Sequence, residues 1–264
     1  MKSNPNCKIN LGLRVLRKRP DGYHDLATVF LPVPLCDQLD IVEAPRFEMT
    51  QSGILVDCSL DDNICVKAYR LLKEEFPSLP PVHIHLQKNI PFGAGLGGGS
   101  SDAAFTLRML NELFALGLTP EALRLRAARL GADCPFFIDN IPAYATGIGD
   151  RLTPLGFNPI EGYDLKIQKP DDAVSTREAY AGIRLPDLDA VADYDVPVTS
   201  PLLRALRQPI ATWRDTIVND FEATVLPQHP AIAALKARFY ADGALYASMT
   251  GSGAAVFALF PMAE

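Results

Sequence analysis

Cysteine is scarce in this chain and does not form the pairs that metal sites and disulfide frameworks use. Five cysteines, Cys7, Cys36, Cys58, Cys65 and Cys134, occur in 264 residues, and no two have the C-x-x-C spacing. An odd number at irregular spacing argues against a zinc cluster or a complete set of disulfides. Small buried thiols in a reducing compartment are the better interpretation, so we expect a cytoplasmic protein.

Long apolar runs and an excess of basic residues are also absent. No apolar stretch approaches the roughly 18 residues of a membrane helix, and residues 1–10 hold no apolar leader. Lysine and arginine number 25 against 31 aspartates and glutamates, a net charge of -6. Nucleic acids and anionic membranes attract basic patches, so this balance argues against both as main partners.

The remaining composition is that of an ordinary globular enzyme, with 48% hydrophobic and 21% charged residues. Disorder is therefore not expected. The length allows one large domain or two interlocked ones.

Glycine gathers in one stretch, PFGAGLGGGSSDA at residues 91–103, which holds five glycines. Glycine costs stability inside helices and strands, so this run predicts a loop. Residues 82–87 before it alternate as in a half-buried strand, and residues 103–114 after it have helical spacing. The loop therefore leads into a helix N-terminus, whose free N–H groups and dipole favour an anion such as a phosphate.

Two familiar nucleotide loops do not fit this context. Gly93, Gly95 and Gly98 satisfy G-x-G-x-x-G, but no second strand ending in an acidic residue follows about 20 positions on. A Walker A loop needs a lysine before its serine, and none precedes Ser100. A flexible linker is not expected between a strand and a helix. Ser100 or Ser101 is expected to cap the helix, and either hydroxyl can reach a phosphate or a metal ion.

Polar residues elsewhere allow two interpretations each. Strict alternation puts Lys8 and Asn10 on the polar face of a strand, where solvation is the usual explanation. Asp133 precedes the apolar run CPFFI, where burial would raise its pKa and a cation would lower it. Alternatively, Asp133 is a cap or turn residue. Tyr23 and His24 follow a Pro-Asp-Gly turn and can hold a nucleobase, or pack as core and surface residues.

The remaining elements are predicted from periodicity and capping. We expect strands at 37–44, 163–170, 244–250 and 254–260, a hairpin at 144–155, and helices at 61–76, 120–131, 213–226 and 231–240. Another short helix is expected after Ser175 or Thr176, and the cap of the 61–76 helix is Asp61, Asp62 or Asn63. Residues 183–212, rich in proline and aspartate, show no readable function.

The loop PFGAGLGGGSSDAA resembles the central phosphate-binding motif of the GHMP kinase superfamily. KINLGLRVLRKRPDGYHDLATVF, GADCPFFI and TGSGAAVFALF together resemble the branch that phosphorylates 4-diphosphocytidyl-2-C-methyl-D-erythritol. These stretches run from residue 8 to residue 260, so the likeness covers nearly the whole chain. Cys7 stands where the family more often has alanine, a small change that leaves the motif intact.

The resemblance implies an α+β GHMP kinase fold with an N-terminal ribosomal S5-like domain, 1–150, and a C-terminal ferredoxin-like domain, 151–264. It implies ATP- and Mg²⁺-dependent phosphorylation of the 2-hydroxyl of 4-diphosphocytidyl-2-C-methyl-D-erythritol, in the non-mevalonate (MEP) isoprenoid route. The alternatives are another small-molecule GHMP kinase, acting on homoserine, mevalonate or a sugar, or a non-catalytic nucleotide-binding protein of this fold. Tyr23 and His24 favour the cytidine-bearing substrate.

The resemblance also implies roles for individual residues. Lys8 and Asp133 are expected to be catalytic. Substrate contacts are expected from Asn10, Tyr23, His24, Thr176 and Tyr180. ATP contacts are expected from Pro91, Phe92, Gly93, Ala94, Gly95, Leu96, Gly97, Gly98, Gly99, Ser100 and Ser101, and the turn at 251–253 is expected to steady this loop. The protein ligands of Mg²⁺ and the oligomeric state stay open.

Overall fold

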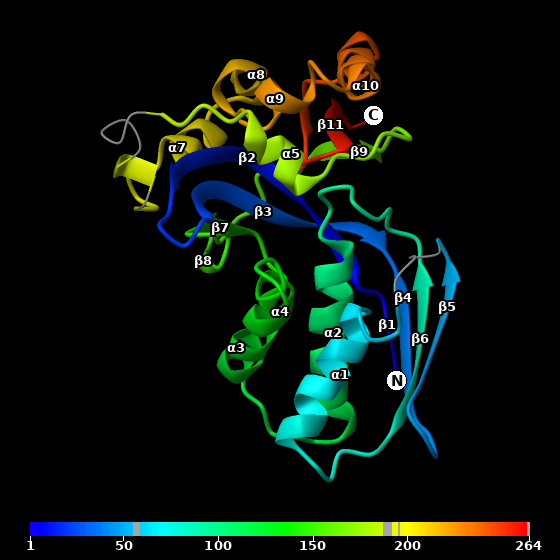
Figure 1. The fold of residues 1–264 in the computed structure, drawn as a ribbon. Helices are drawn as coiled ribbons and strands as arrows, with labels where there is room; N and C mark the ends of the chain where they lie inside the picture. Colours follow the sequence, from blue (N-terminus) through cyan, green and yellow to red (C-terminus); the bar gives the residue numbers. More distant parts are fainter. Residues whose placement is uncertain (55–58, 187–191, 195, 263–264) are drawn as a thin grey trace. The chain divides into compact units, whose positions relative to one another are not determined.

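The computed structural model describes residues 1–54, 59–186, 192–194 and 196–262 (Figure 1). The chain contacts define two compact units that are interleaved in sequence. Unit 1 comprises Met1–Lys8, Pro32–Phe92 and Gly97–Ile141, and unit 2 comprises Ile9–Leu31, Gly93–Leu96 and Pro142–Glu264. The glycine-rich loop contributes to both units. The predicted domain boundary at residue 150 stays a prediction.

Unit 1 is built on a four-stranded sheet. Its strand order is β1 (Lys2–Ser3), β4 (Gln38–Glu43), β6 (Val82–Lys88) and β5 (Glu48–Gly53), with β5 parallel to β6 and the other pairs antiparallel. Figure 1 shows the helices α1 (Ile64–Glu75) and α2 (Gly98–Leu113) along one face of this sheet. The alternation predicted for residues 82–87 is confirmed, since every second residue of β6 is buried.

The helix ends of unit 1 follow the expected capping rules. The Asn63 side chain accepts a hydrogen bond from the Cys65 N–H at the start of α1, so this helix starts later than Asp61. Thr119 caps α3 (Pro120–Leu130), and Gly131 follows its end, as predicted. The one-turn helix α4 (Phe136–Asp139) follows. Within the described residues, no helix is both long and apolar enough to cross a membrane.

Unit 2 includes most of one antiparallel sheet and all of another. The first has the order β2 (Asn6–Lys18), β3 (His24–Cys36), β7 (Ala143–Thr146) and β8 (Arg151–Pro154). The second has the order β10 (Tyr246–Met249), β11 (Val256–Pro261) and β9 (Tyr163–Gln168), and α10 (Pro230–Ala241) packs on it. The hairpin predicted at 144–155 and the two C-terminal strands are confirmed.

The structure from Trp213 to Leu226 differs from the prediction. Instead of one helix, it forms α8 (Trp213–Thr216), an extended segment, and α9 (Glu222–Val225). The Leu13 N–H donates to the Val218 carbonyl at 2.9 Å, and the Asp220 N–H donates to the Leu13 carbonyl at 2.8 Å. These bonds to β2 take the backbone groups that a continuous helix would use, so the prediction of one helix is wrong.

The short helices of unit 2 complete the description. Ser175 caps α5 (Thr176–Ala181) by accepting from the Glu178 N–H, so Ser175 rather than Thr176 is the cap. Within 183–212 the structure has η1 (Ala192–Tyr194), α7 (Pro201–Leu206) and η2 (Ile210–Thr212). Residues 187–191 and 195 of that stretch lie outside the described residues.

Candidate active site

Lys8 and Asp133 form an ion pair in unit 1. The Lys8 Nζ lies 3.3 Å from the Asp133 Oδ2. Lys8 is only 3% exposed, whereas the Asp133 side chain is 32% exposed. A buried ammonium needs a partner, and the partner here is the carboxylate that solvent and ligands can reach. The solvated-face interpretation of Lys8 is therefore wrong, and the two predicted catalytic residues lie together.

The glycine-rich loop packs closely on Lys8 where α2 begins. Gly97 has a positive φ of 69° and precedes the first helical residue. A Cβ atom at this position would lie 3.0 Å from the Lys8 Cε and 3.1 Å from the Phe137 Cζ. A side chain at residue 97 would therefore crowd the lysine and strain the backbone.

The first turn of α2 has free backbone donors and an unpartnered hydroxyl. Among the described residues no side chain caps this helix, and Ser100 and Ser101 lie inside its first turn, so the predicted serine cap is wrong. The Ser101 Oγ is fully buried and has no hydrogen-bond partner in the part of the chain that the structure describes. Uncapped N–H groups at a helix start are suited to an anion.

A buried lysine joins the two ends of the loop. The Lys88 Nζ, at the end of β6, donates to the Asp102 Oδ2 in α2 at 2.9 Å and also to the Asp37 Oδ2. The Asp37 Oδ1 accepts from the N–H groups of Asn89 at 2.6 Å and Ile90 at 2.8 Å. This network therefore holds the residues before the loop and the helix after it.

The charges of this network depend on its burial. Burial raises the pKa of Asp102 to about 8, against the attraction of Lys88 that lowers it. Burial alone would lower the pKa of Lys88. Attraction to Asp102 and hydrogen bonds to both carboxyl groups outweigh this effect, so the net result is a raised pKa of Lys88. Burial therefore opposes the ionised form of Asp102, and the lysine beside it favours that form.

None of the three residues of this network was predicted from the sequence. Lys88 lies on the buried face of β6, together with Val82, Ile84 and Leu86. A lysine on that face needs a buried carboxylate, and this is the one signal that could have revealed the network.

In unit 2, the other part of the loop lies against the turn between β10 and β11. A Cβ atom on Gly95 would lie 2.0 Å from the Thr250 carbonyl oxygen, and one on Gly251 would lie 3.2 Å from the Gly95 Cα. The Ala255 N–H donates to the Ala94 carbonyl at 3.2 Å. The contact expected between this turn and the loop is therefore present.

Asn10 lies beside this turn. It is 2% exposed, and its Nδ2 donates to the Thr28 Oγ1 at 3.1 Å. Its backbone N–H donates to the Thr250 Oγ1 at 2.9 Å. Burial excludes the solvated-face interpretation, while a contact from Asn10 to a substrate stays a prediction.

Three of the predicted substrate residues gather in unit 2. The rings of His24 and Tyr180 stack with their centroids 4.6 Å apart and their planes 22° apart. The Thr176 Oγ1 lies 3.4 Å from the Ser252 Oγ. Burial and repulsion from Lys18 lower the pKa of His24, so its imidazole is neutral at neutral pH. Tyr23 is 61% exposed.

Comparison with known proteins identifies the family. The sequence model of the GHMP kinases N terminal domain matches residues 63–147, and that of the GHMP kinases C terminal domain matches residues 202–264. A 4-diphosphocytidyl-2-C-methyl-D-erythritol kinase of Bacteroides thetaiotaomicron is 49% identical over 260 residues, covering 97% of this chain and 90% of its own. The chain belongs to the GHMP kinase family. As in other GHMP kinases, ATP is the implied phosphoryl donor.

Solved structures agree with this assignment. A crystal structure of 4-(cytidine 5'-diphospho)-2C-methyl-D-erythritol kinase has a TM-score of 0.75 and 33% identity, covering 98% of this GHMP kinase and 90% of that chain. The Methanococcus jannaschii mevalonate kinase has a TM-score of 0.71 at 12% identity, covering 98% and 90%, which shows a shared fold. The predicted α+β GHMP kinase fold is confirmed.

Gly95→Ala is expected to destabilise unit 2 more than Gly93→Ala does. Both glycines have positive φ, 73° and 61°, but a Cβ on Gly93 would meet no atom within 4 Å. The overlap of a Cβ on residue 95 with the Thr250 carbonyl adds about 1–3 kcal/mol to the loss of unfolding free energy. Chemical denaturation of both variants measures the difference, and equal losses would contradict the close contact.

Asp102→Asn is expected to flatten the pH dependence of stability. Because the folded-state pKa of Asp102 is raised from 3.8 to about 8, the folded protein binds one more proton than the unfolded chain between these values. The unfolding free energy of the parent therefore falls as pH rises through this window. Asparagine cannot ionise, so the variant should lose less stability between about pH 5 and about pH 8, by about 1.4 kcal/mol per unit of pKa shift. Parallel denaturation profiles would show that Asp102 is ionised in the folded protein.

Proposed function

We propose that this GHMP kinase transfers the γ-phosphoryl group of ATP to the 2-hydroxyl of 4-diphosphocytidyl-2-C-methyl-D-erythritol, a step of the non-mevalonate isoprenoid route. The observation that supports this substrate is the stack of His24 on Tyr180, because an aromatic pair can bind a cytosine ring by stacking. The relatives that are 45–49% identical bear the name of this kinase.

The loop from Pro91 to Ser101 is the proposed ATP site. The free N–H groups at the start of α2 would hold the phosphates, and the helix dipole would add to their attraction. The positive φ values of Gly93, Gly95 and Gly97 let the backbone approach a ligand without side chains in the way.

Asp133 is the proposed general base and Lys8 its partner. Phosphoryl transfer depends chiefly on positioning and on neutralising charge. The partly exposed Asp133 carboxylate would accept the proton of the substrate hydroxyl. Lys8 is buried, and its Nζ lies 3.3 Å from the Asp133 Oδ2. It would orient this carboxylate and stabilise the negative charge that develops on the phosphoryl oxygens.

The substrate contacts are proposed to come from unit 2. Tyr23, His24 and Tyr180 would contact the cytosine, and the neutral imidazole of His24 can donate one hydrogen bond and accept another. Thr176 would contact the substrate from the start of α5, and Asn10 would orient the polyol end.

Mg²⁺ is proposed to accompany the nucleotide. The described residues contain no group of three or more histidine, cysteine, aspartate or glutamate side chains suited to a metal. This fits an ion held mainly by phosphate oxygens, with Ser100 or Ser101 as a hydroxyl ligand, and the unpartnered Ser101 Oγ has the required chemistry. The bound ion would neutralise negative charge on the phosphates.

We also propose a cytoplasmic location and a division into domains at residue 150. The four described cysteines, Cys7, Cys36, Cys65 and Cys134, are free thiols, as is usual in a reducing compartment, and Cys58 lies outside the described residues. The two family models lie on either side of residue 150, which supports domains of 1–150 and 151–264.

Turnover is expected only with the cytidylated substrate. Release of ADP by the purified protein with ATP and Mg²⁺ should be rapid with 4-diphosphocytidyl-2-C-methyl-D-erythritol and negligible with the same polyol phosphate lacking cytidine. Equal turnover of both would remove the proposed role of His24 and Tyr180. No turnover of either, with ATP still bound, would indicate another GHMP kinase substrate or a non-catalytic role.

Asp133→Asn is expected to lower kcat by about 10²–10⁴-fold with little change in either KM, because the amide cannot accept the hydroxyl proton. The matched control is Asp139→Asn in α4, where the carboxylate pairs with Arg124 instead. Steady-state kinetics of both variants test the assignment. Near-parental kcat in Asp133→Asn would exclude this residue as the base.

A further inference from the structure

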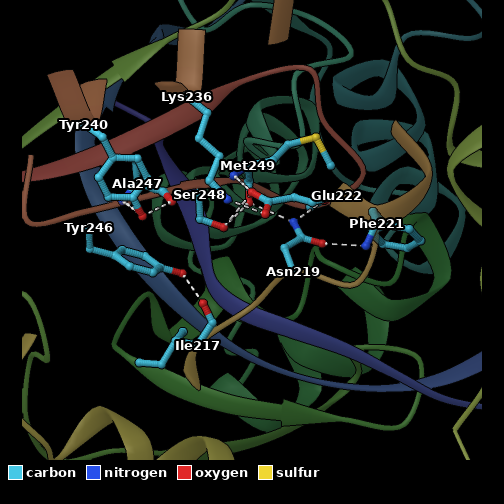
Figure 2. A network of polar contacts seen from close by, with 11 residues as sticks. Ile217, Asn219, Phe221, Glu222, Lys236, Tyr240, Tyr246, Ala247, Ser248 and Met249 are labelled. Carbon is cyan, nitrogen blue, oxygen red and sulfur yellow. Dashed lines mark hydrogen bonds and ion pairs between the residues drawn. The ribbon is translucent and has the colours of Figure 1, made fainter. Parts of the chain in front are cut away.

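Four consecutive residues of unit 2, Asn219–Glu222, send their side chains to different parts of that unit. We call them the 219–222 segment. Periodicity predicted a helix across this segment, whereas Asn219 pairs with Leu13 of β2 and Asp220 begins the turn that leads to α9. Figure 2 shows Asn219, Phe221 and Glu222 of this segment beside the end of β10.

Asn219 holds the start of the turn between β10 and β11. Its Nδ2 donates to the Met249 carbonyl and to the Gly251 carbonyl, both at 2.8 Å. Its Oδ1 accepts from the Phe221 N–H at 3.0 Å (Figure 2). Asn219 is 3% exposed, and both amide protons and the oxygen are used. The amide therefore fixes where Gly251 lies.

Gly251 in turn lies against the glycine-rich loop. A Cβ atom on Gly251 would lie 3.2 Å from both the Cα and the carbonyl oxygen of Gly95. Any shift of the turn at 251–253 would therefore move Gly95 or open a gap beside it. Through this contact, Asn219 affects the position of the proposed nucleotide loop.

Phe221 supports the aromatic stack. Its ring meets the ring of Tyr180 edge to face, with centroids 4.8 Å apart and planes 84° apart. Tyr180 stacks on His24 with its own ring. Phe221 is 3% exposed and belongs to the buried core of unit 2, against which Tyr180 packs.

The two acidic residues anchor the segment. The Asp220 Oδ2 accepts from the Val15 N–H of β2 at 2.8 Å. The Glu222 Oε1 accepts from the Met249 N–H at 2.7 Å, and its Oε2 lies 2.5 Å from the Lys236 Nζ (Figure 2). With both acidic side chains bound in this way, Asn219 and Phe221 have little freedom to move independently.

We propose that Asn219 and Phe221 are positioning residues for the two ends of the reaction. Asn219 sets the turn that supports the nucleotide loop, and Phe221 sets the His24–Tyr180 stack that receives the base of the acceptor. Neither touches a ligand itself. This inference rests on the proposed function and adds to it a single rigid segment that serves both substrates.

The two residues are tested by separate variants. Asn219→Asp keeps the shape but replaces two donors with an oxygen that faces carbonyls, so the KM for ATP should rise at least about tenfold. The KM for the cytidylated acceptor should stay within about twofold. Phe221→Leu should do the reverse, raising the acceptor KM about three- to tenfold and leaving the ATP KM unchanged.

Two control variants separate positioning from stability. Asn111→Asp breaks a similar amide bridge, in which Asn111 Nδ2 and Oδ1 bond the Leu118 carbonyl and N–H at 3.1 and 2.9 Å. Phe239→Leu removes a 2% exposed ring from the same core as Phe221. Both controls should lower the melting temperature and leave both KM values within about twofold.

The proposal is supported if each variant raises a different KM, Asn219→Asp that for ATP and Phe221→Leu that for the acceptor. It is overturned if Asn219→Asp and Phe221→Leu raise both KM values together, or lower only the melting temperature. If the parent protein shows no turnover, the proposed function fails, and binding decides this inference: a non-hydrolysable ATP analogue should bind Asn219→Asp at least about tenfold more weakly than the parent. Equal affinity would overturn it.

Discussion

The two ends of the glycine-rich loop depend on one buried interaction in unit 1, that of the Lys88 ammonium group with the carboxyl groups of Asp37 and Asp102. The residues before the loop bond to Asp37, and the helix after it carries Asp102. Glycine-rich chain has the largest conformational entropy to lose on folding, so it needs fixed ends. Removing one partner of a buried ion pair typically costs about 3–5 kcal/mol, because the other charge is left buried without compensation, so each member of the network needs the others.

The middle of the loop depends on a different kind of contact. Ala94 accepts a backbone hydrogen bond from Ala255, and Gly95 lies so close to the Thr250 carbonyl that no Cβ atom would fit there. Backbone packing of this kind depends on the absence of side chains at Gly95 and Gly251, and side-chain bonds such as those of Asn219 supply the rigidity behind it.

Local chemistry was predictable from the sequence, and long-range pairing was not. The loop, the cap at Thr119 and the hairpin follow from turn and capping residues, which act within a few positions. The strand β3 was not predicted, because its apolar residues occupy both faces and hide the period of two. Lys8, Asn10 and Lys88 have partners that are distant in sequence, so burial could not be foreseen from spacing alone. The extended stretch after Thr216 likewise depends on Leu13, about 200 positions away in the chain.

The uncapped start of α2 has a consequence for the evolution of this enzyme. The donors that it presents are main-chain amides, which every residue type except proline carries. Apart from a change to proline, a point substitution can change the shape around these amides but cannot delete their hydrogen-bonding groups. An inhibitor that imitates the phosphates would therefore bind to main-chain amides, and few single amino-acid replacements could make the protein resistant to it.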